Sequence, residues 1–211
     1  MKFSTVDEAL TQLKHGGLII VSDNEGRENE GDLIGLGSKI TGETVNFMIT
    51  HAKGLLCMPL SAKLADKFEL KPIVDKNTEI NGTAFVTTSD GSYQTTGVTT
   101  GISAFDRAST IKKFADPSST VTDFVHPGHM FPLVAVNGGV RERSGHTEAA
   151  VELAKLAGEP EVGAIIEIIK DDGHMARRDF LEKMAHKYDL PFITIDQIIE
   201  YLNAQGGDQR E

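Results

Sequence analysis

The spacing of apolar positions changes repeatedly along the chain, and each change predicts a new helix or strand. Thr5 and Glu8 have the spacing of a capping box, so a helix is expected over residues 6–13. The uninterrupted apolar run from Leu18 to Val21 then predicts a buried strand. Helical and strand patterns alternate in this way to the end of the chain. The pattern therefore predicts an α/β or α+β fold.

The remaining elements follow from the same reasoning. Further strands are expected at residues 33–36, 55–58, 83–88, 133–136, 163–169 and 192–195. Further helices are expected after the capping residues Thr41, Ser61, Ser103 and Thr147, and over residues 178–188 and 196–202. Pro59 is expected to stop the strand at 55–58, and residues 126–139 are rich in Pro and Gly and read as mostly loop. With no repeat or linker, we expect one domain over residues 1–203 and a flexible tail over 204–211.

Composition narrows the class of protein. Of the 211 residues, 39% are hydrophobic and 25% are charged, which is typical of a soluble globular chain. The net charge of −10 argues against a nucleic-acid partner, which would require a basic surface. Apolar runs are too short to span a membrane, and the N-terminus lacks the apolar region of a signal peptide, so a cytoplasmic protein is expected. The single cysteine, Cys57, excludes an intramolecular disulfide.

A first candidate site is the polar segment from Asp23 to Asp32, which joins two apolar strands. It holds five carboxylates and one guanidinium in ten residues. Such crowding is unfavourable unless a cation or substrate hydroxyls compensate it, and oxygen ligands suit a hard cation such as Mg²⁺. A solvated acidic loop would have the same composition. The segment alone leaves both interpretations open.

A second candidate site lies at residues 138–148, where a glycine-containing turn leads into a predicted helix. The N–H groups and dipole of a helix N-terminus favour an anion, and Arg143 could clamp a phosphate in a bidentate manner. The hydroxyls of Ser144 and Thr147 add donors, and His146 could ligate a metal. Alternatively, Thr147 is only a helix cap and Arg143 a surface charge.

Two further side chains are ambiguous. His129 follows a constrained turn that also contains His126. Glu167 lies within a strand of isoleucines, where its carboxylate either points to solvent by strand alternation or is held inward for a purpose. The residues alone favour the solvent-facing position for Glu167 and give His129 no particular role.

Four segments in order along the chain resemble stretches of the 3,4-dihydroxy-2-butanone 4-phosphate synthase family. They are Arg27–Asp32, His126–Leu133, Arg143–Ala149 and Asp171–Met175. The resemblance extends over residues 5–202. It implies a single-domain three-layer sandwich of α/β class around a mixed sheet, and homodimers with active sites at the subunit interface. Because many relatives carry a second enzymatic domain after this one, a chain of this length is expected to be monofunctional.

The resemblance also assigns roles to particular residues. It implies that Glu28 and His146 bind divalent metal, Mg²⁺ with Mn²⁺ as an alternative. It implies that Asp32, His129 and Glu167 are catalytic. Substrate contacts are implied for Arg27, Glu28, Asp32, Arg143, Ser144, Gly145, His146, Thr147 and Glu167. The roles of His129 and Glu167 come from the resemblance and not from their spacing.

The activity implied is the conversion of D-ribulose 5-phosphate into L-3,4-dihydroxy-2-butanone 4-phosphate and formate, in riboflavin biosynthesis. The working hypothesis is that metal stabilises an enediolate, that Asp32 removes the C3 proton, and that the acidic loop closes over the sugar phosphate. One rival is a metal-dependent sugar-phosphate isomerase, which would release no formate. Another is a non-catalytic phosphate-binding module on a related fold, which would have little need for the acidic loop.

Overall fold

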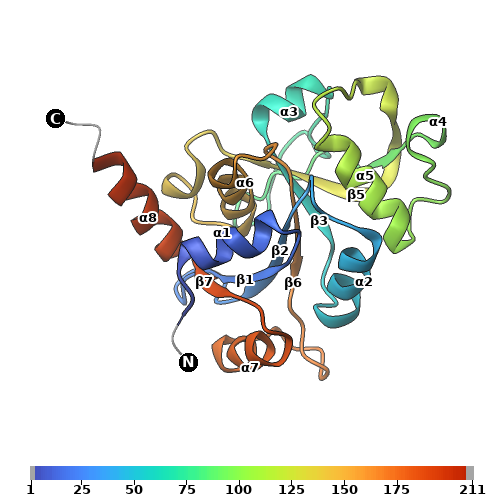
Figure 1. Ribbon diagram of the computed structural model, residues 1–211. Helices are drawn as coiled ribbons and strands as arrows, with labels where there is room; N and C mark the ends of the chain where they lie inside the picture. The colour runs from blue at the N-terminus through green and yellow to red at the C-terminus, as the bar shows by residue number, and fades with distance from the viewer. Residues whose placement is uncertain (1–2, 208–211) are drawn as a thin grey trace.

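A computed structural model describes residues 3–207 of the chain (Figure 1). Within this range the strands are β1 (Ile19–Ser22), β2 (Gly31–Leu36), β3 (Cys57–Ser61), β4 (Ser89–Gly91), β5 (Phe124–Ala135), β6 (Gly163–Glu167) and β7 (Phe192–Thr194). These seven described strands form one sheet in the order β4-β5-β3-β6-β2-β1-β7. Parallel pairs (β1 with β7, β3 with β5) and antiparallel pairs (β1 with β2, β2 with β6) make it a mixed sheet.

Helices cover both faces of this sheet. They are α1 (Val6–Lys14), α2 (Gly42–His51), α3 (Ala62–Lys67), α4 (Tyr93–Thr96), α5 (Ala104–Phe114), α6 (His146–Ala157), α7 (Arg178–Tyr188) and α8 (Ile195–Gly207), with 3₁₀ turns η1 (Val121–Asp123) and η2 (Gly139–Arg141). One apolar cluster joins the sheet to α1, α6 and α8, and a second joins it to α2, α3, α5 and α7. The expected three-layer sandwich around a mixed sheet is thus confirmed. None of the helices between residues 3 and 207 is long and apolar enough to cross a bilayer.

Burial on both faces explains the unbroken apolar strands. In β1, Ile20 packs in the cluster on the α2 face, whereas Ile19 and Val21 pack in the cluster on the α6 face. Alternate side chains of a strand point to opposite faces, so a sheet covered twice needs apolar residues at every position. Cys57 belongs to the α6-face cluster and is buried there, where burial raises the pKa of its thiol.

Several capping signals are confirmed. Thr5 and Glu8 form both hydrogen bonds of the capping box at the start of α1. The side chains of Thr41 and Ser103 accept hydrogen bonds from the first turns of α2 and α5. The prediction for Thr147 is wrong, because α6 begins one residue earlier at His146 with Gly145 as its N-cap. Thr147 is therefore a buried residue of the first turn.

The strand predictions need three corrections. β3 runs through Pro59 to Ser61. It pairs with β6 at Cys57, and Leu60 forms an isolated bridge with Val162 just before β6, so Pro59 lies between these two contacts. β5 spans twelve residues, where only residues 133–136 were expected to be strand. Residues 83–88 form isolated bridges and no strand. Proline and glycine are tolerated in β5 because it pairs with the short edge strand β4 on one side.

The end of the chain also differs from expectation. The last helix, α8, continues past Leu202 to Gly207, so residues 204–207 of the expected tail are helical. Residues 208–211 lie outside the described range.

Candidate functional site

The candidate site lies at one end of the sheet, where β2 begins, β6 ends and α6 begins. Asp32 of β2 is the cross-strand neighbour of Glu167 of β6. Ile34 and Ile165, each two residues away, pack in the cluster on the α6 face. Because side chains two apart on a strand share a face, Asp32 and Glu167 both face α6. The sheet thereby places two carboxylates side by side on the face that α6 covers.

His146 brings an imidazole to these carboxylates. Its Nδ1 lies 3.8 Å from Glu28 Oε2 and 3.9 Å from Asp32 Oδ1. His146 and Asp32 are both buried, whereas Glu28 is half-buried. Three residues thus meet at one point: Glu28 from the loop before β2, Asp32 from β2 and His146 from the start of α6. Glu28 and His146 are 118 positions apart in the sequence.

Burial and mutual attraction shift the protonation equilibria of this group. Burial raises the pKa of Asp32 to about 7, and the effect of His146 only partly opposes it. Burial would lower the pKa of His146, but the charges of Asp32 and Glu28 outweigh it and raise the value to about 9. The nearby His146 holds the pKa of Glu28 below its ordinary value. The two carboxylates thus favour the protonated imidazole, and a metal ion bound there would have to displace that proton.

The acidic loop, defined here as residues 23–31, is shaped around Asp23. Its carboxylate accepts hydrogen bonds from the backbone N–H of Glu28 (3.0 Å) and of Glu30 (2.8 Å). Arg27 donates to Asp23 at 3.0 Å and to Glu28 Oε2 at 2.7 Å. Asp23 was not singled out by the sequence analysis, since its role depends on bonds that form only in the folded loop. It orients Glu28 toward His146.

These residues fit a divalent cation. Ligand atoms of Asp23, Glu28 and His146 all lie within 4.8 Å of one another. Two ligands of one Mg²⁺ ion at about 2.1 Å each can be at most roughly 4.2 Å apart, and the 3.8 Å between Glu28 and His146 meets that limit. Among the described residues, the buried Asp32 Oδ1 and His146 Nε2 have no hydrogen-bond partner. Asp23 is engaged by backbone donors, and Glu28 by the side-chain donors of Arg27 and Asn81.

Glu167 is held inward. Its Oε2 accepts a hydrogen bond of 2.8 Å from the backbone N–H of Leu55, and the side chain is half-buried beside Asp32. The solvent-facing position that the residues alone favoured is therefore wrong. The reason is that β6 ends at Glu167, where the segment from Gly54 to Leu55 covers the strand.

Arg143 is tied into the wall of the site by all three guanidinium nitrogens. Nε donates to the backbone oxygen of Asn81 (3.1 Å), Nη2 donates to Thr83 Oγ1 (3.1 Å), and Nη1 donates to Glu148. Glu148 is buried and also accepts from the backbone N–H of Val136 at 3.2 Å. Ser144 is half-buried, and Gly145 and Thr147 are buried at the start of α6. Arg143 is thus more than a surface charge.

Replacing Arg143 by Ala is expected to lower the free energy of unfolding by about 3 kcal/mol, because the buried Glu148 carboxylate would lose its counter-charge. Chemical denaturation measures this. Arg141→Ala is the matched control, since Arg141 is exposed and donates to Asn203. Adding Glu148→Gln to Arg143→Ala should recover much of the loss. A loss no larger than that of Arg141→Ala would show that the pair does not stabilise the fold.

His129 is placed elsewhere. It lies on β5, with its side chain 48% exposed and its Nδ1 2.7 Å from Asp90 Oδ2 of β4. Its backbone N–H also donates to Asp90 Oδ1 at 2.8 Å. Strands β3 and β6 separate β5 from β2, so the fold does not bring His129 to Asp32 within the chain. The Asp90–His129 pair is instead presented at the far edge of the sheet.

Asn81 and Asp90 contact predicted site residues, and the sequence analysis missed both of them. The Asn81 amide donates to Glu28 Oε1 at 2.7 Å, while its backbone oxygen accepts from Arg143. Asn81 thereby links the acidic loop to the start of α6. Each of these residues contacts a partner at least 39 positions away in the sequence. No local sequence pattern distinguishes them from other polar residues outside the predicted helices and strands.

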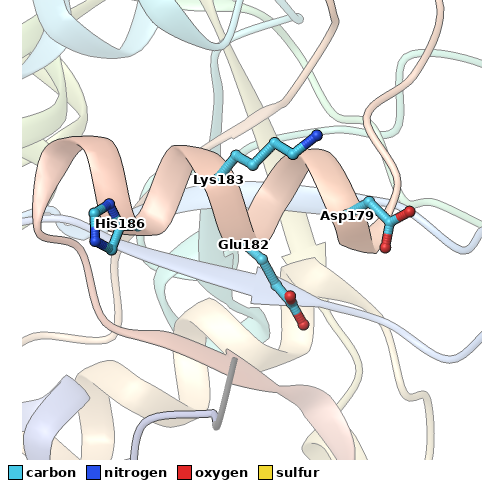
Figure 2. A pocket seen from close by; sticks show the side chains of 4 residues that line it. All are labelled: Asp179, Glu182, Lys183 and His186. Carbon is cyan, nitrogen blue, oxygen red and sulfur yellow. The ribbon is translucent and has the colours of Figure 1, made fainter.

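A separate hollow of about 460 Å³ lies along the outer face of α7. Figure 2 shows its four lining side chains, Asp179, Glu182, Lys183 and His186, spread along the helix and pointing in different directions. A catalytic or metal site needs its groups to converge on one point. This hollow therefore does not compete with the site at the start of α6.

Comparisons with known proteins identify the family to which the chain belongs. The family model described as 3,4-dihydroxy-2-butanone 4-phosphate synthase matches residues 7–201. A riboflavin biosynthesis protein RibBA from Bacillus cytotoxicus is 50% identical over 199 residues, which cover 94% of this chain and 49% of the relative. The chain thus spans about half the length of such curated relatives.

Two solved structures share the fold. The two-domain synthase RibBX from A. baumannii has a TM-score of 0.89 and 43% identity, over 94% of this chain and 57% of that one. A 3,4-dihydroxy-2-butanone 4-phosphate synthase in complex with two magnesium ions has a TM-score of 0.92 and 37% identity, over 97% and 99% of the two chains. The sequence match and the shared fold together show that this chain belongs to the 3,4-dihydroxy-2-butanone 4-phosphate synthase family.

Proposed function

We propose that the chain converts D-ribulose 5-phosphate into L-3,4-dihydroxy-2-butanone 4-phosphate and formate, as a step of riboflavin biosynthesis in the cytoplasm. Family membership supports this proposal. The observation that carries it is the geometry at the end of the sheet, where His146 Nδ1 lies within 4 Å of a carboxylate oxygen of Glu28 and of Asp32. Glu167 is the cross-strand neighbour of Asp32. Carbon balances as five atoms into four plus one, with no oxidant or reductant needed.

Glu28 and His146 are the proposed magnesium ligands, with manganese as an alternative ion. Bound metal would act as a Lewis acid that polarises the carbonyl and hydroxyl oxygens of the sugar. The magnesium complex of a relative supports this choice of ion. Asp23 positions Glu28, because its carboxylate accepts a hydrogen bond from the Glu28 backbone N–H.

Asp32 is the proposed general base that takes the proton from C3 of the sugar. A base works best when its pKa lies near the working pH, and burial raises the pKa of Asp32 to about 7. Its Oδ1 has no hydrogen-bond partner among the described residues and is therefore ready to accept a proton. Glu167, on the same face, is the proposed second carboxylate for later proton transfers.

The start of α6 is the proposed phosphate seat. The free N–H groups at the N-terminus of the helix attract an anion, and Arg143, Ser144 and Thr147 lie in or beside that turn. Arg27 is a second cation at the rim of the site. Gly145 leaves room for the side chains of Arg143 and Glu148, which a Cβ there would meet. For Arg143 to bind phosphate, its bonds to Asn81 and Thr83 have to open.

Arg143→Lys is the informative substitution, since it keeps a charge near Glu148 while removing the bidentate fork. The KM for ribulose 5-phosphate should rise about tenfold, the equivalent of one charge-assisted hydrogen bond. Steady-state kinetics with ribulose 5-phosphate and with ribulose test this. An equal loss with ribulose, which has no phosphate, would contradict the assignment.

We further propose that the enzyme acts as a homodimer in which His129 serves the active site of the partner subunit. Three strand spacings separate β5 from β2, roughly 14 Å. Large apolar side chains are exposed around this edge of the sheet: Tyr93, Ile102, Phe105 and Val125. Such a surface is typical of a subunit contact. His129 paired with Asp90 suits a proton-transfer role.

Mg²⁺-dependent release of formate from ribulose 5-phosphate tests the proposed reaction. Formate is measured with a coupled dehydrogenase, and EDTA should abolish its release. A sugar-phosphate isomerase would yield another pentose phosphate without formate. A phosphate-binding module would bind the sugar phosphate and leave it unchanged. Either of those results would refute the proposed activity.

A further inference from the structure

The acidic loop that carries Glu28 is held from outside by a residue far along the chain. Arg177 directs its Nη1 to the backbone oxygens of Glu28 (2.8 Å) and Asn29. The same nitrogen lies 3.8 Å from Glu30 Oε1. One cation thus contacts three consecutive residues of the loop, including the proposed metal ligand.

The conformation of the loop explains why a cation is needed there. Asn29 has a φ of 55°, in the left-handed region that Asn adopts more readily than most other residues with a side chain. This turn points successive carbonyl groups at one place, where they would repel each other and the nearby carboxylates. A guanidinium satisfies both carbonyls and offsets part of the negative charge.

Arg177 is itself rigidly placed. The neighbouring Ala176 N–H donates to the oxygen of Ile168, and the Ile168 N–H donates to the oxygen of Gly31, where the loop ends. Leu181 of α7 packs so closely on Gly31 that a Cβ there would lie 2.5 Å from its Cδ1. The start of α7 is therefore bound both to the end of β6 and to the end of the loop.

We propose that Arg177 is a positioning residue that sets the backbone of the acidic loop and so aims Glu28 at the metal ion shared with His146. This inference rests on the proposed function of the site. Arg177 touches no reacting atom and acts through Glu28. Without it, the carbonyl groups of Glu28 and Asn29 lose their donor. The position of Glu28 then depends on Asp23, Arg27 and Asn81 alone, which hold it less firmly at its distance from His146.

The test compares Arg177→Met with Arg178→Met. The two arginines are adjacent, with side chains 50% and 57% exposed, but Arg178 pairs with Glu182 and lies over the Phe3 ring, away from the loop. Binding of Mg²⁺ alone is measured by calorimetry, and binding of Mn²⁺ alone by electron paramagnetic resonance. Arg177→Met should weaken metal binding about 10-fold to 100-fold, as loss of a ligand-orienting partner does. Arg178→Met should leave it unchanged.

Three further readouts separate positioning from a general loss of structure. Both variants should unfold in one cooperative transition, with at most a modest fall in melting temperature for Arg177→Met. Arg177→Lys should recover part of the metal affinity, and saturating Mg²⁺ should restore part of kcat for Arg177→Met with little change in KM. Equal metal affinity in the two Met variants, or loss of cooperative unfolding with Arg177→Met alone, would overturn the inference. Because metal binding is measured without turnover, the inference can hold even if no formate is released, and it can fail while formate is released.

Discussion

Glu28→Gln is expected to abolish Mg²⁺-dependent formate release while the protein stays folded, with kcat/KM falling by at least about 10²–10³-fold. The substitution preserves shape but removes the charge that a hard cation requires. The amide oxygen of glutamine can accept a hydrogen bond from Asn81 or Arg27, but its NH₂ group cannot accept the other one. A modest fall in melting temperature is therefore compatible with the prediction. Formate release over a range of Mg²⁺ concentrations and the thermal unfolding curve are the two measurements.

Glu25→Gln is the matched control for this prediction. Glu25 belongs to the same acidic loop but is exposed and lies outside the group of potential ligands. It carries the same charge, so a loss caused only by the net charge of the loop would appear in both variants. Near-normal turnover in Glu28→Gln at ordinary Mg²⁺ concentrations would refute the assignment of Glu28 as a ligand.

Much of this fold could be predicted from sequence because its signals are local. The capping box of Thr5 and Glu8 closes within four residues, and the apolar run of β1 reflects burial on both sheet faces. The acidic loop could be recognised in the sequence because five carboxylates lie within ten residues between two predicted strands. In each case a short segment carries the whole physical reason for its structure.

The features that escaped prediction depend on distant partners. Pro59 is tolerated in a central strand because it lies between the contacts of Cys57 with β6 and of Leu60 with Val162. Asn81 reaches Glu28 across 53 positions, and Arg177 reaches it across 149. Pattern analysis cannot assign such contacts, since an exposed-looking Asn or Arg is compatible with many surfaces. The inward position of Glu167 was implied by family resemblance alone.

Mixing two inactive variants is expected to restore activity if His129 serves the partner's site. His129→Ala should lower kcat by about 10²–10⁴-fold, the range for a lost proton-transfer group. Glu28→Ala should be inactive for lack of metal. When the two are unfolded together and refolded in equal amounts, half of the dimers are mixed, and each mixed dimer has one intact site. Formate release should then reach about a quarter of the wild-type rate.

A mixture of Glu28→Ala with His146→Ala is the control for this complementation. Glu28 and His146 approach to 3.8 Å within one chain, so no mixed dimer of these variants contains an intact site. Recovery in the first mixture and none in the second requires that His129 and Glu28 of each working site come from different subunits. If neither mixture recovers activity although sedimentation shows dimers, His129 serves the site of its own chain. The β4–β5 edge would then have to move toward β2, from which β5 is separated by roughly 14 Å of sheet.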